Sequence, residues 1–196
     1  MHDLRPATTR VIDLLDGVDD AHLTAPTPMG PDVTGLLHHL TGLALAFRDA
    51  AGKVDGPTTG TPPAPVEGPL PDGWREELRT RLDGLGEAWA DPAAWTGMTR
   101  AGGVDLPGEV CGLVALDEVL LHGWDLAAAT GQPYAPTDAE AEAVLPIVTP
   151  PEDPEQAAAE RQGLFGPALP VPEGATGFER VLALAGRDPG WAPPAP

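Results

Sequence analysis

Glu118 and His122 are the residues of this sequence whose types and spacing point most directly to chemistry. They stand four residues apart, so on a helix they share one face about one turn apart. That spacing suits two ligands of one divalent metal ion. Asp125 follows three residues after His122 on the same side, and Cys111 precedes Glu118 by two turns. The stretch therefore predicts a polar stripe along one face of a helix.

The rest of this helix is apolar nearly all round, which predicts that it runs through the protein interior. Its apolar residues are Val110, Leu113, Val114, Leu116, Val119, Leu120, Leu121 and Leu126. A glutamate and a histidine buried there need partners, because burying an unpaired polar group costs roughly 2–7 kcal/mol. A bound metal is one such partner, and a buried hydrogen-bond network is the other. The spacing alone leaves both interpretations open, since such pairs also occur on solvated helices.

His39 is the third candidate ligand, and it lies on the apolar stripe of a second helix predicted over residues 31–51. Gly35 and Gly42 flank it one turn to either side. A glycine inside a helix costs roughly 0.5–1 kcal/mol relative to alanine, so these two suggest that something approaches the helix closely. Taken alone, His39 is better interpreted as a hydrogen-bonded core histidine.

Apolar residues at helical spacing predict four long helices, over residues 4–17, 31–51, 72–89 and 107–130. Shorter helices are predicted over residues 138–146, 154–162 and 177–185. Asp72 is the predicted N-cap of the third long helix, and Thr137 with Glu140 forms a capping-box pattern. With little strand signal, these elements predict an all-α fold built on a four-helix bundle.

The connections between these helices are long and rich in Pro and Gly. The chain holds 24 glycines and 25 prolines, but they cluster between clear helical windows, which indicates loops and not a disordered chain. Residues 52–73 are predicted to form a long crossing loop. Residues 90–107 form another, with one short irregular strand near residues 95–100.

The length of 196 residues predicts a single domain, 1–196, with residues 149–196 as a loop-rich C-terminal extension packed on it. The formal charge is −19, with 30 acidic and 11 basic residues, so nucleic acid and anionic membranes are poor partners. A single cysteine excludes an intramolecular disulfide. The N-terminus lacks a signal-type apolar segment, and the apolar run 40–47 is too short to span a bilayer. We therefore expect a soluble cytoplasmic protein.

The candidate site combines His39, Glu118 and His122, if their two helices are neighbours. Three protein ligands leave a coordination position open for water or substrate, as in catalytic zinc sites. Zinc is the expected metal, and nickel or iron(II) would also accept these ligands. A bound water would have its pKa lowered to about 7, and a bound thiol would be held as thiolate.

The segments His38-His39-Leu40-Thr41-Gly42, Glu118-Val-Leu-Leu-His122-Gly-Trp-Asp125-Leu and Ala129-Thr-Gly-Gln resemble a known family. They are similar to the mycothiol-dependent maleylpyruvate isomerase-like domain, which belongs to the DinB/YfiT-like superfamily of metalloenzymes. The closing Gly186-Arg-Asp-Pro-Gly-Trp191 resembles the tail of a single-domain branch of that family. The chain departs from the family pattern at the entrance to the second helix, where Pro31 stands near a usual tryptophan and Gly35 replaces a common aspartate.

The resemblance implies a DinB-like up-down four-helix bundle with a metal held by His39, Glu118 and His122. It also implies an enzyme that uses this metal to activate a low-molecular-weight thiol of the mycothiol type for transfer, addition or isomerisation on a small electrophile. Activation of water in place of the thiol is included in this hypothesis. One alternative is a non-catalytic, metal-dependent binding or biosynthetic accessory protein. Another is a metal-free helical interaction module.

Several further residues are candidates for supporting roles. Asp125 would orient His122 from outside the ligand set, or bond locally at the helix end. Cys111 is interpreted as a small buried hydrophobe, since nothing basic near it in sequence would lower its pKa. Arg100 and Arg187 are conceivable clamps for an anionic substrate, although solvated surface arginines are the default interpretation. Beyond the small-molecule substrate, a homodimer is the partner that base rates favour.

Overall fold

The computed structural model describes residues 1–161 and 164–193. The chain divides into two compact units, Met1–Tyr134 and Ala135–Pro196. The boundary falls before α6 (Asp138–Val148), so it lies earlier than the predicted start of a C-terminal extension at residue 149. That the units form one domain, with the second packed on the first, stays a prediction.

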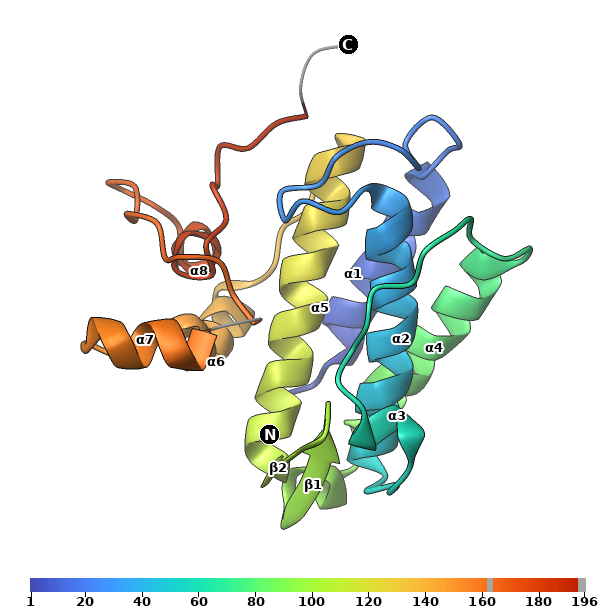
Figure 1. The fold of residues 1–196 in the computed structure, drawn as a ribbon, viewed down its shortest axis with the longest axis vertical. Coiled ribbons are helices and arrows are strands. Elements are labelled where there is room, and N and C mark those ends of the chain that lie inside the picture. Colours follow the sequence, from blue (N-terminus) through green and yellow to red (C-terminus); the bar gives the residue numbers. More distant parts are fainter. Residues whose placement is uncertain (162–163, 194–196) are drawn as a thin grey trace. The chain divides into compact units, whose positions relative to one another are not determined.

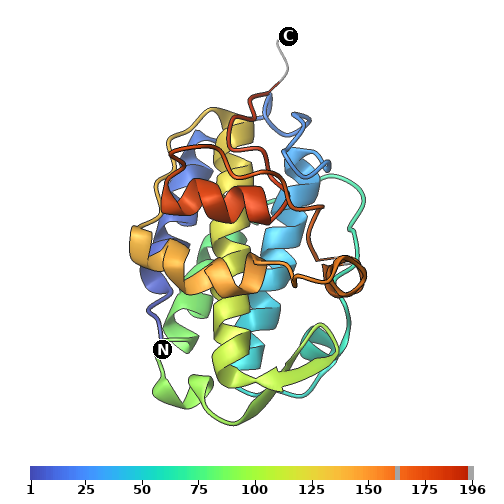
Figure 2. The same cartoon turned by 90° about the vertical axis from the view of Figure 1, so that its left-hand side faces the viewer.

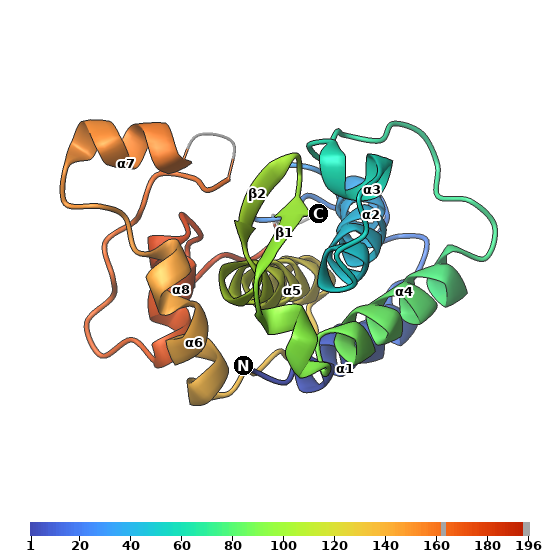
Figure 3. The same cartoon turned by 90° about the horizontal axis from the view of Figure 1, so that it is seen from below.

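The first unit is a bundle of four long helices, which confirms the predicted all-α fold (Figure 1). The helices are α1 (Arg5–Leu14), α2 (Val33–Ala51), α4 (Trp74–Ala88) and α5 (Gly108–Thr130). A 3-10 turn, Leu15–Gly17, extends α1. Seen from below, α2 lies between α5 and α4, and α1 packs against α4 and α5 (Figure 3).

The long loop after α2 sets the directions of the helices. Arg81 of α4 donates to the carbonyl of Thr41 (2.9 Å), and Trp89 donates to that of Phe47 (3.1 Å). Residue numbers rise together along both helices, so α2 and α4 are parallel. The loop 52–73 therefore carries the chain back along the whole bundle, as Figure 1 shows. The bundle runs up, down, down and up, and does not alternate at every helix.

Two tryptophans close the bundle at the start of α5. Trp89 is fully buried, and the ring of Trp95 meets it edge to face at 5.2 Å between centroids. Gly112 of α5 faces both rings: a Cβ there would lie 2.6 Å from Trp95 and 2.8 Å from Trp89. Only a residue without a side chain lets α5 approach this closely.

A β-hairpin leads into α5, where the sequence predicted one irregular strand. β1 (Met98–Ala101) pairs antiparallel with β2 (Val104–Pro107). Gly102 and Gly103 form the two-residue turn, with φ of +58° and +82°, a conformation that glycine adopts without strain. The Gly-Gly pair was a hairpin signal that the sequence interpretation treated as loop. Two short helices, α3 (Pro57–Gly60) and the 3-10 turn Pro92–Trp95, also lie inside predicted loops.

The helix ends agree with the sequence in some places and correct it in others. Asp32 caps α2 by accepting from the amide of Gly35 at 2.8 Å. The predicted N-cap Asp72 is wrong, because α4 begins one residue later, after Gly73 in the left-handed region (φ +78°). A turn in which Trp74 donates to the carbonyl of Pro71 requires that conformation.

The second unit contains α6 (Asp138–Val148), α7 (Pro154–Arg161) and α8 (Gly177–Leu184), and α6 packs on α8 (Figure 2). The predicted capping box of Thr137 and Glu140 is confirmed, and α6 continues through Pro146. The buried Arg161 donates to the carbonyls of residues 148, 166 and 184, which ties the unit together. Gln162, the predicted end of α7, lies outside the described residues.

Candidate metal centre

The antiparallel helices α2 and α5 bring His39 opposite Glu118 and His122. The two imidazole Nε2 atoms are 3.1 Å apart. Oε2 of Glu118 lies 3.1 Å from Nε2 of His122 and 3.6 Å from Nε2 of His39. The four-residue spacing on α5 aligns two of the groups, and the neighbouring helix supplies the third. The candidate site needed these two helices to be neighbours, and they are.

These separations fit one metal ion. Zinc ligands at about 2.0–2.2 Å in tetrahedral geometry stand roughly 3.3–3.6 Å from one another. The three ligand atoms lie close to that spacing, and all of the group's candidate ligand atoms fall within 4.8 Å. Two imidazoles and one carboxylate are also ligand types that zinc, iron(II) and nickel accept. The residues present therefore fit a divalent cation.

The cluster is graded in exposure from one end to the other. The side chains of His39 and Glu118 are 35% and 25% exposed, that of His122 is 15% exposed, and that of Asp125 is inaccessible. The His39 side of the cluster therefore meets solvent, while the Asp125 side is closed by protein. The exposed ligand atoms are thus those nearest His39.

Hydrogen bonds within the cluster favour the charged forms of Glu118 and His122, although both side chains are largely buried. Burial alone would lower the pKa of His122, but hydrogen bonds to Asp125 and Glu118 outweigh it and raise this pKa to about 9. Burial likewise would raise the pKa of Glu118, yet hydrogen bonds from His122 and His39 hold it well below the usual range. The cluster thus stabilises an anionic carboxylate beside a protonated histidine, and a cation that binds there would have to displace the proton from Nε2.

The space beside the two glycines that flank His39 is not filled by another helix. A Cβ at Gly42 would meet no atom within 4 Å, and one at Gly35 would lie 3.2 Å from Cβ of Pro31, in the preceding turn. The expectation that another part of the protein approaches α2 closely at these glycines is therefore wrong. A neighbour that the sequence did not indicate is the long loop, whose Gly68 carbonyl lies 3.2 Å from Nε2 of His38.

Cys111 and Arg187 lie outside the ligand group. Cys111 is fully buried, and burial raises the pKa of its thiol to about 12. It stands two turns, or about 10 Å, before Glu118 along α5. Arg187 belongs to the second unit and is 3% exposed, so its interpretation as a solvated surface arginine is wrong. Its role as a clamp for substrate stays a prediction.

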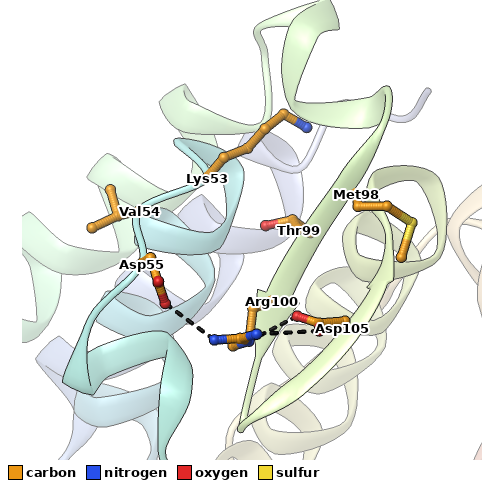
Figure 4. A pocket seen from close by; sticks show the side chains of 7 residues that line it. All are labelled: Lys53, Val54, Asp55, Met98, Thr99, Arg100 and Asp105. Atoms are coloured by element: carbon orange, nitrogen blue, oxygen red, sulfur yellow. Dashed lines mark hydrogen bonds and ion pairs between the residues drawn. The ribbon is translucent and has the colours of Figure 1, made fainter.

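Arg100 lies in a separate pocket of about 190 Å³ beside the β-hairpin (Figure 4). Its guanidinium pairs with Asp55 at 3.1 Å and with Asp105 at 2.7 Å. The hydrogen bond from Arg100 lowers the pKa of Asp105. The pocket lies beyond the end of α2 at Ala51, which is about 18 Å along the helix from His39. Arg100 is therefore occupied by two carboxylates far from the cluster.

Comparisons with known proteins agree with this geometry. Residues 4–127 match the family model of the mycothiol maleylpyruvate isomerase N-terminal domain. Among solved structures, a histidine-to-alanine mutant of the mycothiol-dependent maleylpyruvate isomerase superposes with a TM-score of 0.53 at 19% identity. The match covers 74% of this chain and spans 64% of the other protein's length. A search of curated proteins found no match.

Two findings bear on how the chain is classified. In the described part of the chain, no helix combines the length and apolar character that crossing a membrane demands. The family match extends from the start of α1 almost to the end of α5, so it includes every long helix of the bundle and all three candidate ligands. The protein belongs to the mycothiol maleylpyruvate isomerase N-terminal domain family.

Proposed function

We propose that this protein is a divalent-metal-dependent enzyme that activates a small thiol for attack on a small electrophilic substrate. His39, Glu118 and His122 would hold the metal, with zinc as the expected ion. The thiol would be of the mycothiol type, and the reaction would be a transfer, addition or isomerisation. The proposal treats maleylpyruvate, or a related unsaturated acid, as the first substrate to test.

The observation that carries this proposal is the spacing of three ligand atoms around one point, with one side facing solvent. The separations of 3.1, 3.1 and 3.6 Å match three corners of a tetrahedron around zinc. The fourth corner would be available to an exogenous ligand. Structural zinc sites close that corner with a fourth protein ligand, whereas catalytic sites keep it open.

The bound ion would supply Lewis acidity, holding a thiol as thiolate or lowering the pKa of a water to about 7. The chain's own residues would set the rest. Glu118 and the two histidines orient the open position toward the exposed side of the cluster. The apolar residues of α5 keep water from the other side, so a substrate enters along one path.

Other features of the chain support a small-molecule role. Its charge of −19 opposes binding to phosphate backbones and anionic lipid surfaces. The exposed side of the cluster is bounded by two helices and suits a compact substrate. A cytoplasmic location and a homodimeric state remain predictions that follow from composition and base rates.

The experiment begins with protein purified without a histidine tag. Elemental analysis should find about one divalent ion per chain, and removal of the ion by a chelator should abolish thiol-dependent turnover. Mycothiol with maleylpyruvate, followed by a panel of other electrophiles, should show metal-dependent consumption of substrate. His122→Ala should lose both the metal and the turnover, whereas Arg100→Ala should keep both.

Three outcomes would discriminate the alternatives. Bound metal with tight ligand binding but no turnover across the panel would favour the non-catalytic accessory protein. Folded protein that neither retains nor takes up divalent metal would show that the cluster is a hydrogen-bond network, as in the interaction-module hypothesis. Turnover that proceeds equally well without any thiol would replace the thiol by water as the nucleophile.

A further inference from the structure

We infer that Asp125 is a positioning residue, which fixes the ring of His122 so that Nε2 points into the cluster and thereby sets the affinity for a divalent cation. The inference rests on the proposed function for the identity of the ligands, and it adds the residue that orders them. The carboxylate of Asp125 accepts from Nδ1 of His122 at 3.0 Å.

The direction of side chains on α5 explains how this contact forms. Side chains on a helix lean toward its N-terminus, over the preceding turn. Asp125, three residues after His122, therefore reaches back to the near nitrogen of the ring. The ring of His122 leans back in turn toward Glu118, which brings Nε2 within 3.1 Å of that carboxylate. The three residues form one continuous chain along a single helix face.

The burial of Asp125 prevents water from replacing its hydrogen bond to His122. Its side chain is inaccessible to solvent, so this hydrogen bond is shielded from exchange with water. A carboxylate only accepts hydrogen bonds, so the ring that bonds Asp125 carries a proton on Nδ1. Glu118 faces Nε2 at 3.1 Å, and a cation bound there would take the place of a proton on that nitrogen. The lone pair of Nε2 then faces Glu118 and His39, where a cation would need it.

His39 provides an internal contrast. In the described ranges, no hydrogen-bond acceptor is found at its Nδ1, and its side chain is 35% exposed. One histidine of the pair is therefore held at its outer nitrogen by a buried carboxylate, whereas the polar contacts of the other are those of Nε2 inside the cluster. The ordering of the ligand set depends on the α5 side.

The balance of charges in the cluster also supports a role for Asp125 in cation binding. Glu118 and Asp125 contribute two negative charges, and two neutral imidazoles contribute none. A divalent cation balances this set, whereas the loss of the Asp125 charge would leave one positive charge in excess. Removing such an outer partner from a metal-bound histidine typically weakens metal affinity about 10–100-fold.

The test compares Asp125→Asn with a matched variant, Glu109→Gln. Both remove one negative charge from α5, but Glu109 stands in its exposed first turn, about 20 Å from His122. Zinc affinity is measured by competition with a chromophoric chelator, and the ligand geometry by the visible spectrum of the cobalt(II) protein. Nitrogen NMR of the histidine rings in the zinc-bound protein reports which nitrogen of His122 binds the metal and which keeps a proton.

We expect Asp125→Asn to bind zinc about 10–100-fold more weakly, to show an altered cobalt spectrum, and to change the nitrogen resonance of Nδ1 of His122. Glu109→Gln should match the wild type in all three measurements. Equal zinc affinity in Asp125→Asn and wild type, or zinc bound through Nδ1 of His122 in the wild type, would overturn the inference. If Asp125→Asn unfolds, the nitrogen that binds zinc in the wild type decides alone.

These outcomes separate the inference from the proposed function. Wild-type protein that binds zinc in an Asp125-dependent way, yet turns over no thiol substrate, would refute the proposed function and leave the role of Asp125 standing. Turnover by the wild type and by Asp125→Asn with identical zinc affinities would refute the role of Asp125 and leave the proposed function standing. Wild-type protein that binds no divalent metal would overturn both.

Discussion

The two halves of α5 treat buried ionisable groups in opposite ways. Near the start of the helix, Cys111 is fully buried, and burial raises the pKa of its thiol to about 12, which keeps it neutral. Two turns later, burial acts on Glu118 and His122 in the same direction, against charge. There the hydrogen bonds prevail, the pKa of His122 rises to about 9, and Glu118 stays ionised. The hydrogen-bond partners of a group, and not its depth of burial, therefore decide which half of α5 carries charged side chains.

Close packing is found in both halves of the helix. Gly112 lies against the rings of Trp89 and Trp95, and Gly123 lies against Tyr134, with no space for a side chain at either glycine. Only the second half also carries the polar cluster, which faces a neighbouring histidine and, beyond it, solvent. Packing thus holds α5 in place along its length, and the second half presents polar groups from that fixed support.

The largest effect should come from removing a ligand in the second half. Zinc at about 1,000 times its dissociation constant stabilises a protein by roughly 4 kcal/mol. For a chain of this size that corresponds to a rise of about 8–16 °C in the unfolding temperature. Glu118→Gln should abolish most of this rise, because it removes the anionic ligand while keeping the shape of the side chain. Thermal unfolding with and without zinc measures it.

Cys111→Ala is the matched control from the first half of the helix. It should lower the stability of the metal-free protein, since it opens a small cavity, but should keep the full rise with zinc. If zinc stabilised Glu118→Gln as strongly as the wild type, or lost its effect in Cys111→Ala, the placement of the metal site in the second half of α5 would be wrong.

A smaller effect should follow from pH. Metal binding needs a neutral His122, so below pH 9 zinc must displace its proton, and affinity should rise about tenfold per pH unit from pH 7 toward 9. The metal-free protein should change in the opposite sense. Because the folded-state pKa is raised, the contribution of His122 to stability is complete below about pH 6.5 and is lost as pH rises through 9. Titration calorimetry across this range tests the zinc affinity, and denaturant unfolding tests the stability of the metal-free protein; a zinc affinity or a stability that does not change with pH would contradict the corresponding prediction.

The sequence predicted those features that depend on local patterns. Apolar periodicity located the long helices, and the four-residue spacing of Glu118 and His122 was enough to place both on one helix face. The capping box of Thr137 and Glu140 was equally local. The position of His39 opposite that face needed the family resemblance, because nothing in the spacing of one helix specifies which helix lies beside it.

The features that the sequence missed are long-range or very short. The parallel arrangement of α2 and α4 depends on the path of the loop 52–73, which has no periodicity from which to infer a direction. β2 is four residues long and exposes Val104, so no alternation of buried side chains marks it. The hydrogen bond between His38 and the Gly68 carbonyl depends on the same loop path.

The smallest predicted changes in stability come from replacing two helical glycines, Gly112 and Gly42, by alanine. Gly112→Ala places a methyl group against the tryptophan rings and should destabilise the protein by about 1–3 kcal/mol, as overpacking does. Gly42→Ala meets no atom within 4 Å on the exposed face of α2, and should stabilise it by about 0.5–1 kcal/mol. Denaturant unfolding of the metal-free variants measures both changes. A similar loss of stability in both would mean that helix propensity, and not the contact with the tryptophans, explains the glycine in α5. Unchanged zinc affinity in folded Gly112→Ala would show that packing at the start of α5 supports the polar cluster without changing its affinity for zinc.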